Sequence, residues 1–331
     1  RPRPGRFGRD VRRRHRNTGM MALSVFLSAS SSVALRPASS LPRLAASRRM
    51  PAVRCFEDAA SKGPEMAGGD MYTEMTSASY LDGARPAPSW ELAAANFQRQ
   101  SRTIVRQAAE KVGLAVRDAH QPPDCLGLTL SNEAVYEAER RREEAGGRVD
   151  AHPVSRGLYD LGCLLLDNLF DERPIQRFWF LEIIARIPYF AYVSMLHLYE
   201  SLGWWRGPEL RKVHNAEEWN ELHHLLIMES LGGNALWSDR FLGYHVAIAY
   251  YWFLIVVYFF SPAVAYQFME LLEAHAVDTY STFVSENRER LASLPAPSVA
   301  RSYYGSGDLY YFDDFQVSRP PGSRRPACET L

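Results

Sequence analysis

The feature that most constrains the fold is a series of long apolar segments between residues 154 and 290. Their hydrophobic residues recur with the period of an α-helix, without the alternation typical of a β-strand. Pro208, the pair Gly232-Gly233 and the pair Ser261-Pro262 fit helix boundaries. The pattern predicts an amphipathic helix at 155–170, followed by four long helices at roughly 174–203, 209–231, 237–260 and 262–290. The sequence therefore predicts an all-α bundle.

The beginning of the chain has the composition of a leader. Residues 1–55 contain 13 arginines, no lysine and a single acidic residue. Because the first residue is not Met, we interpret residues 1–19 as possible upstream sequence and the part from Met20 or Met21 as a signal and transit peptide. Tracts rich in serine, alanine and arginine are typical of plastid leaders, and mitochondrial presequences have a similar composition. Both destinations remain open at this point.

The rest of the chain divides into two further regions. Residues 56–153 form a variable N-terminal region with helices expected at Trp90–Val112 and Asn132–Glu144. Residues 154–331 form the bundle, which we expect to be irregular after residue 290. Beyond the leader, acidic residues outnumber basic ones by 37 to 25. This excess of negative charge argues against nucleic acid as a partner.

Two segments have the character of membrane-contacting helices. From Phe241 to Met269 the chain has 29 residues without Asp, Glu, Lys or Arg, a length that spans a bilayer. The same stretch contains His245 and Ser261-Pro262, so a buried bundle helix followed by the start of the next is a comparable interpretation. The segment 155–170 has an apolar face and few charges, which suits a helix lying in a membrane interface.

The chemistry is concentrated in a few carboxylates and one histidine within the apolar segments. The only Glu-x-x-His of the chain is Glu221 to His224, and positions i and i+3 share one face of a helix, whereas His223 points elsewhere. Glu182 and Glu273 lie within otherwise apolar helices, where a carboxylate is costly unless it is paired or binds a metal. Helical bundles that bind two irons use this pattern. Spacing alone does not separate a metal site from interhelical salt bridges.

A resemblance to a known family favours the metal site. The blocks that carry it are RFWFLEIIARIPYF, LHLYESLGWWR, KVHNAEEWNELHHLLIMESLGGN, DRFLGYHVA, EAHAVDTYSTF and GDLYYFDDFQVSRPPGSRRP. Through them the stretch from Arg177 to Pro326 resembles the alternative oxidase family, and most closely its plastid terminal oxidase branch. The segment GDLYYFDDFQ distinguishes that branch from the mitochondrial one.

The resemblance implies a ferritin-like di-iron helical bundle with membrane-interface helices and two non-haem Fe ions. Carried over by motif, the iron ligands are Glu182, Glu221, His224 and Glu273. Tyr280 matches the redox-active tyrosine of the family and is the expected catalytic residue.

Further positions match the family's quinol pocket and the polar interior of its bundle. The implied quinol-binding residues are Arg156, Asp160, Arg177, Leu272 and Thr279. For Arg156 and Asp160, four residues apart, an ion pair within one helix is the alternative. His197 and Tyr258 match polar positions near the irons, although such residues are also common in a helical core or interface.

The end of the chain departs from the family. Family members continue beyond the RRP motif into a last helix that bears Asp-Glu-x-x-His, whereas this sequence stops at Leu331. The expected bundle therefore lacks its last ligand helix and two of six iron ligands. A fragment of a longer protein explains this better than a naturally inactive form.

The implied function is that of a plastoquinol:oxygen oxidoreductase, which reduces O2 to water with electrons from quinol. The resemblance further implies a homodimer bound to one side of the thylakoid membrane. The alternatives are a ubiquinol oxidase of the mitochondrial inner membrane, a di-iron monooxygenase and an inactive fragment.

Overall fold

The computed structural model of the chain describes residues 87–115, 122–305 and 328–331. Within these ranges the regular elements are helices, and the only strand-like feature is an isolated bridge between Pro295 and Thr330. The all-α prediction is therefore confirmed. The leader and the segment GDLYYFDDFQ lie outside the described residues.

The helices follow the predicted order with small shifts at their ends. Their bounds are α4 Ser89–Lys111, α5 Asn132–Arg142, α6 Pro153–Leu169, α7 Pro174–Ala185, α8 Ile187–Ser201, α9 Pro208–Ser230, α10 Trp237–Phe260, α11 Pro262–Ser293 and α12 Ser298–Gly305. Proline occupies the first turn of α6, α7, α8, α9 and α11. The missing amide hydrogen of proline costs nothing there, because the first turn has no partner for it.

Two expectations about the helices were wrong. The segment predicted as one helix at 174–203 is divided at Arg186 into α7 and α8. Pro188 has no amide hydrogen to donate to the carbonyl of Ile184, so the regular ladder is interrupted just before it. The region after residue 290, expected to be irregular, contains α12, which is only eight residues long. So short a helix shows too few repeats of the apolar pattern to be recognised.

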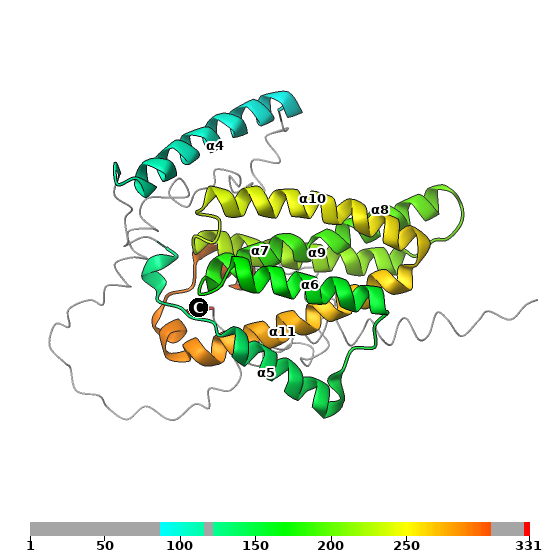
Figure 1. The fold of residues 1–331 in the computed structure, drawn as a ribbon. Helices are drawn as coiled ribbons and strands as arrows, with labels where there is room; N and C mark the ends of the chain where they lie inside the picture. The colour runs from blue at the N-terminus through cyan, green and yellow to red at the C-terminus, as the bar shows by residue number, and fades with distance from the viewer. Residues whose placement is uncertain (1–86, 116–121, 306–327) are drawn as a thin grey trace, which may run out of the picture.

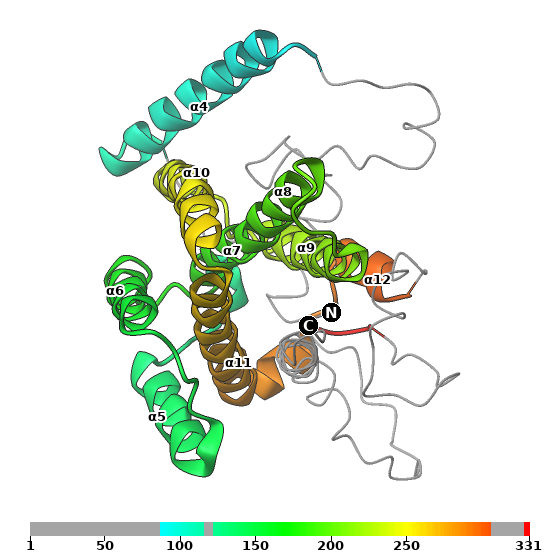
Figure 2. The same cartoon turned by 90° about the vertical axis from the view of Figure 1, so that its right-hand side faces the viewer.

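The helices pack around the pair α7 and α8 (Figures 1 and 2). Helix α7 contacts α9 and α10, and α8 contacts the same two helices. Helix α11 packs against α10 and carries α5 and α6 on its other side, while α12 lies against α9. Helix α4 lies apart from the bundle beside α10. It is joined to the α9–α10 region by side-chain amides, such as Gln107, whose Nε2 donates to the carbonyl of Ala235 at 3.0 Å.

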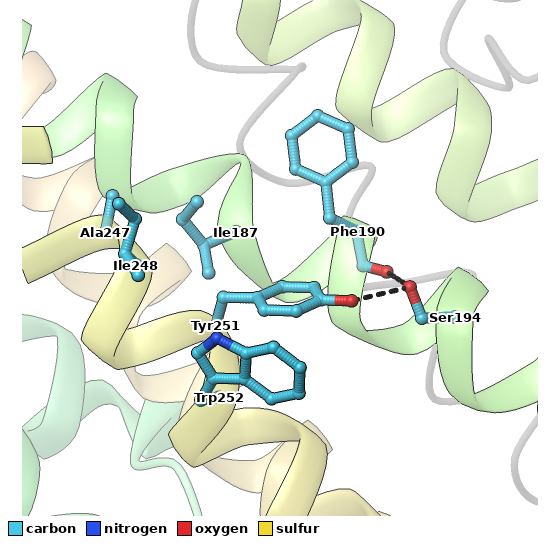
Figure 3. A pocket seen from close by; sticks show the side chains of 7 residues that line it. All are labelled: Ile187, Phe190, Ser194, Ala247, Ile248, Tyr251 and Trp252. Carbon is cyan, nitrogen blue, oxygen red and sulfur yellow. Dashed lines mark hydrogen bonds between the residues drawn. The ribbon is translucent and has the colours of Figure 1, made fainter. Parts of the chain in front are cut away.

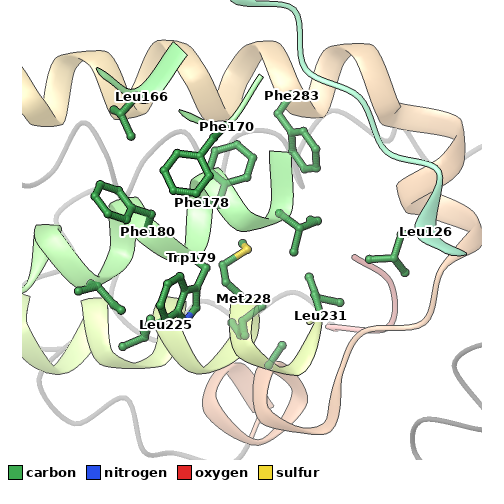
Figure 4. Close-up of a cluster of buried hydrophobic side chains, with 14 of the residues drawn as sticks. Leu126, Leu166, Phe170, Phe178, Trp179, Phe180, Leu225, Met228, Leu231 and Phe283 are labelled. Atoms are coloured by element: carbon green, nitrogen blue, oxygen red, sulfur yellow. The ribbon is translucent and has the colours of Figure 1, made fainter. Parts of the chain in front are cut away.

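The core consists of two clusters of buried apolar side chains. The first gathers around Phe178 and Trp179 of α7, both fully buried (Figure 4). The second gathers around Tyr192 and Met195 of α8 together with Leu254 of α10. Burying one large apolar side chain contributes about 1.5–3 kcal/mol. The two clusters therefore supply much of the driving force for folding.

The turn between α9 and α10 requires its two glycines. Gly232 has φ +81°, a left-handed conformation that glycine adopts without strain. At Gly233 a Cβ atom would lie 2.5 Å from the Cβ of Trp179. Any side chain there would displace the largest residue of the first core cluster.

Among the residues that the structure describes, two stretches are long and apolar enough to cross a membrane by length and composition. They are Pro174–Ser201, which comprises α7 and α8, and α10. The first is the central core helix pair, with 56% of its most apolar window buried, whereas only 22% of the corresponding window of α10 is buried. The outer faces of α6 and α10 are apolar and exposed, through Leu161, Leu164, Leu165 and Leu169 on α6 and Ile248, Trp252, Val256 and Phe260 on α10.

Candidate metal centre

Three predicted ligands from two helices meet inside the bundle. Glu182 of α7 and Glu221 and His224 of α9 each offer one ligand atom, and these atoms lie within 4.8 Å of one another. Nδ1 of His224 is 3.3 Å from Oε2 of Glu221 and 3.7 Å from Oε2 of Glu182. The spacing of three residues places Glu221 and His224 on one face of α9, which packs against α7.

Glu182 is buried without full compensation of its carboxylate. Its side chain is 3% exposed, and within the described residues Oε2 has no hydrogen-bond partner. Burial, followed by the negative charge of Glu221, raises the pKa of Glu182 well above its usual value. A carboxylate with an unpartnered oxygen beside a second carboxylate is what a bound cation would stabilise.

The pKa of Glu221 is shifted in the opposite direction. Burial works against its ionised form, but the nearby His224 and its hydrogen bond lower the pKa of Glu221 below the usual value. The pKa values of the two neighbouring carboxylates are therefore shifted in opposite directions. The carboxylate oxygen of Glu182 without a hydrogen bond, the second carboxylate of Glu221 and the imidazole of His224 together fit a metal ion such as iron, which takes carboxylate and imidazole ligands.

Glu273 of α11 lies close to the centre but is turned toward another partner. The hydroxyl of Tyr189 donates to its Oε1 at 2.9 Å. Burial, followed by the charge of Glu221, raises the pKa of Glu273 to about 8. Glu273 does not belong to the group of ligand atoms within 4.8 Å, so its role as a ligand stays a prediction.

Tyr280 contacts the centre directly. Its hydroxyl donates a short hydrogen bond to Oε1 of Glu182. Its ring stacks on Phe178, with ring centroids 4.3 Å apart and planes at 15°. Burial, followed by the charge of Glu182, raises the pKa of Tyr280 well above its usual value. The phenol is therefore neutral at physiological pH.

The other nitrogen of His224 is covered by residues that the sequence analysis missed. Nε2 lies 3.3 Å from Nδ2 of Asn220 and 3.4 Å from the hydroxyl of Tyr304. Tyr304 belongs to α12, the helix that was not predicted. His223 faces elsewhere, as expected, because its ring stacks on Tyr303 at 4.0 Å.

The predicted quinol-binding arginines lie near opposite ends of α6. Arg156, in the first turn of α6, lies 3.6 Å from Glu143 and donates to the carbonyl of Val149. Arg177 of α7 is 2% exposed and pairs at 2.9 Å with Asp167, in the last turn of α6. Within the described residues, Nε of Arg177 has no hydrogen-bond partner.

The other predicted residues lie in different environments. Asp160 is exposed, and among the described contacts no ion pair joins it to Arg156. Leu272 packs against the second core cluster, and Thr279 is fully buried with its hydroxyl on the carbonyl of His275. His197 is exposed on α8, and no described contact joins it to the centre. Tyr258 is buried and lies 3.1 Å from Tyr266, hydroxyl to hydroxyl.

A second polar group between α5, α6 and α11 was also missed. Tyr159 of α6 donates to Glu139 at 2.8 Å, and its hydroxyl is 3.1 Å from Nδ1 of His275. On the same side, Arg142 pairs with Asp278 at 2.8 Å. The charged composition of the helix predicted at Asn132–Glu144 does not indicate this burial. Only the packing of α5 against α11 places Glu139 and Arg142 inside.

Facing helices of the bundle contribute two carboxylates and a histidine to one cluster, which is the arrangement of helical-bundle proteins that build a metal site in their core. Residues 149–316 match the alternative oxidase family, and the chain belongs to that family.

Relatives with curated descriptions agree with this assignment. The chain is 46% identical over 211 residues to ubiquinol oxidase 4, chloroplastic/chromoplastic, of Arabidopsis thaliana, covering 64% of this chain and 58% of that protein. It is 27% identical over 144 residues to ubiquinol oxidase 2, mitochondrial, of Nicotiana tabacum, covering 42% and 46%. The chain thus spans only about half the length of these relatives. No solved structure gives a significant match.

Proposed function

We propose that this chain is the catalytic part of a plastoquinol:oxygen oxidoreductase that reduces O2 to water in plastids. The observation that carries the proposal is the cluster of Glu182, Glu221 and His224, in which the buried Glu182 has a carboxylate oxygen without a hydrogen-bond partner among the described residues. The much higher identity to a chloroplastic than to a mitochondrial ubiquinol oxidase supports the plastid assignment.

The residues of the centre have two proposed roles, iron binding and the donation of an electron and a proton. Glu182, Glu221, His224 and Glu273 would hold two non-haem irons, which when bound pass electrons to oxygen. Tyr280 fixes the carboxylate of Glu182 through its hydrogen bond and is placed to give up an electron and a proton. Two quinols supply the four electrons and four protons that convert one O2 into two waters.

Quinol reaches the protein from the membrane in this proposal. The exposed leucines of α6 and the exposed Phe259 and Phe260 at the end of α10 support binding to one side of the thylakoid membrane. The residues that the family resemblance implies for the quinol site are Arg156 and Asp160 on α6, Arg177 on α7, and Leu272 and Thr279 on α11. The unpartnered Nε of Arg177 supports a role as a donor to a quinol oxygen.

A homodimer contact would lie on the groove between α8 and α10 (Figure 3). The groove is lined mainly by apolar side chains, including Ile187, Phe190, Ile248 and Trp252. Its polar contact is internal, since the hydroxyls of Ser194 and Tyr251 lie 3.0 Å apart. An apolar groove whose hydroxyls are already paired suits a second copy of the chain. The molar mass in solution of an Ile248→Arg variant tests this contact.

The deciding experiment measures iron content and quinol-dependent oxygen uptake on the same preparation of the longer protein, because the family resemblance implies two further iron ligands beyond Leu331. We expect bound iron and faster uptake with a short-chain plastoquinol than with a ubiquinol analogue. The change Glu182→Gln should remove both iron and uptake. Glu209→Gln, on the exposed first turn of α9, is the matched control and should remove neither.

The second candidate is a mitochondrial ubiquinol oxidase, supported by the mitochondrial relatives. Preference for the ubiquinol analogue, together with mitochondrial import of residues 1–55 fused to a fluorescent protein, would replace the plastid assignment. Absence of iron from the wild-type chain would instead indicate an inactive form.

A further inference from the structure

A row of aromatic rings leads from Glu273, a predicted ligand beside the candidate metal centre, to the protein surface. It begins at Tyr189, whose hydroxyl donates to Glu273, and ends at Trp204, which lies in the loop after α8 and is 62% exposed. Helices α8, α9, α10 and α11 all contribute to it. In order, the rings are Tyr189, His214, Tyr266, Tyr258, Tyr199 and Trp204.

The rings of this row are evenly and closely spaced. From the centre outward, successive ring centroids are 6.1, 5.7, 5.6, 6.1 and 6.0 Å apart. Tyr192 adds a parallel contact, 5.2 Å from the rings of both His214 and Tyr258. Electron transfer falls off steeply with distance, so several short steps between tyrosine and tryptophan rings are faster than one long step. His214 is not itself oxidised, and the electron passes between Tyr189 and Tyr266 across its imidazole, which contacts both rings. Tyrosine and tryptophan are the side chains that give up a single electron at the potentials reached in oxygen reduction.

The buried tyrosines of the row also have partners for their protons. A phenol that loses an electron becomes strongly acidic and must pass its proton to a hydrogen-bonded neighbour. The hydroxyl of Tyr266 lies 2.9 Å from Nε2 of His214, and the hydroxyl of Tyr258 lies 3.1 Å from that of Tyr266. Glu217 orients the imidazole through Nδ1 of His214 at 2.9 Å. At the outer end, the indole of Trp204 is exposed and exchanges its proton with water.

We propose that this aromatic row is a one-electron path that connects the metal centre to a surface electron-entry site at Trp204, where a soluble enediol reductant of the ascorbate class donates. The proposal rests on the proposed function, because oxygen reduction supplies the oxidant. Its role is to complete the reduction of oxygen when quinol delivers fewer than four electrons.

The electrons and protons balance in this scheme. At the centre, partly reduced oxygen that still needs one electron takes this electron from the inner end of the row and one proton from water. The oxidised position then moves outward, ring by ring, until the indole of Trp204 has lost one electron and its N–H proton. The enediol then gives one electron and one proton to the indole and is itself oxidised to its radical. The row returns to its starting state.

The first test needs no metal. A photo-generated ruthenium(III) tris-bipyridine oxidises exposed tryptophans of the full chain, and transient absorption follows the tryptophan radical as it converts to a tyrosyl radical. We expect the tyrosyl yield to fall several-fold in Tyr199→Phe, which keeps the ring but removes the oxidisable phenol, and in Trp204→Phe. Trp205→Phe is the matched control and should leave the yield unchanged, because Trp205 is 50% exposed but outside the row. Equal yields in all four proteins would overturn the proposal.

The second test uses the iron-loaded chain with oxygen and limiting quinol, followed by mass spectrometry of oxidised residues. We expect several-fold more oxidation at Trp204 than at Trp205, suppression of that excess by ascorbate, and loss of the excess in Tyr199→Phe. Added hydrogen peroxide, which diffuses, should mark both tryptophans alike. Oxygen uptake together with equal oxidation of Trp204 and Trp205 would refute the electron path and leave the proposed function intact. Absence of uptake would refute the proposed function, and the photochemical test would still decide whether the row conducts.

Discussion

At the scale of single residues, buried carboxylates are retained where an apolar side chain would be more stable. Glu182 has an oxygen without a hydrogen-bond partner among the described residues, and Glu229 of α9 is half-buried against Trp179, whose indole N–H donates to it at 3.2 Å. Both acids have a raised pKa because of burial. Each acid therefore costs stability when it ionises in the folded chain.

The change Glu182→Gln should stabilise the metal-free chain while it abolishes metal binding. A neutral amide avoids the cost of a buried carboxylate and can donate toward Glu221. We expect the free energy of unfolding at neutral pH to rise by about 1–3 kcal/mol, measured with urea in the presence of a chelator. A metal-free variant less stable than the wild type would show that Glu182 is already compensated.

Glu229 should make stability depend on pH. Burial raises its pKa to about 7, above the ordinary value of 4.5, so the folded chain holds this proton more tightly than the unfolded chain. Its contribution to stability is greatest below pH 4.5 and is lost as the pH rises toward 7, by about 2–3 kcal/mol. Urea unfolding at pH 5 and 8 should show this loss in the wild type and a smaller one in Glu229→Gln. Identical pH dependence in both proteins would contradict the assignment.

At the scale of helices, an ion pair fixes the charged helix α5 to the bundle. Arg142 at the end of α5 pairs with Asp278 of α11, and both side chains are largely removed from water. Replacing one partner leaves the charge of the other poorly compensated. Each single substitution should therefore lower the free energy of unfolding by more than the intact ion pair contributes to it.

A double-mutant cycle tests this attachment. Arg142→Ala and Asp278→Ala should each lower the free energy of unfolding by about 1–3 kcal/mol, and the double variant should lose less than the sum. Hydrogen exchange in α5 should accelerate in both single variants, whereas α10 should not change. Additive losses with unchanged exchange would show that apolar contacts alone hold α5.

At the scale of the whole molecule, two apolar faces determine how the protein meets a membrane. Helix α10 passes the length and composition test for a span, yet its inner side packs against α7, α8 and α11. An orientation along the membrane would leave those contacts intact. Polarised infrared spectroscopy on anionic vesicles should therefore show helices lying mainly parallel to the bilayer plane. Helices oriented mainly along the membrane normal would contradict this.

Substitutions that introduce a charge on the exposed apolar face of α6 test membrane binding. Leu164→Glu and Leu165→Glu should reduce vesicle binding about tenfold or more each, because each removes an exposed apolar side chain from the interface and adds a charge. Flotation with vesicles measures the effect. Glu209→Gln on α9 is the control and should bind as the wild type does.

The sequence was sufficient for most of this architecture and for the inner ligands of the centre. Long apolar periods predict α9, α10 and α11 within a few residues, and the Glu-x-x-His spacing places Glu221 with His224. The break at Arg186 was not predicted, because a single proline near a helix start and one inside a helix look alike in sequence. Tyr304 was missed because its importance comes from tertiary packing alone.

The interruption at Arg186 also divides the core. Helix α7 belongs to the first apolar cluster and α8 to the second. Glu182 extends from the first half, whereas Glu273 is held by Tyr189 of the second. An ion bound by both acids would join the two clusters across the break at Arg186, so binding at the centre would restrict the movement of α7 relative to α8.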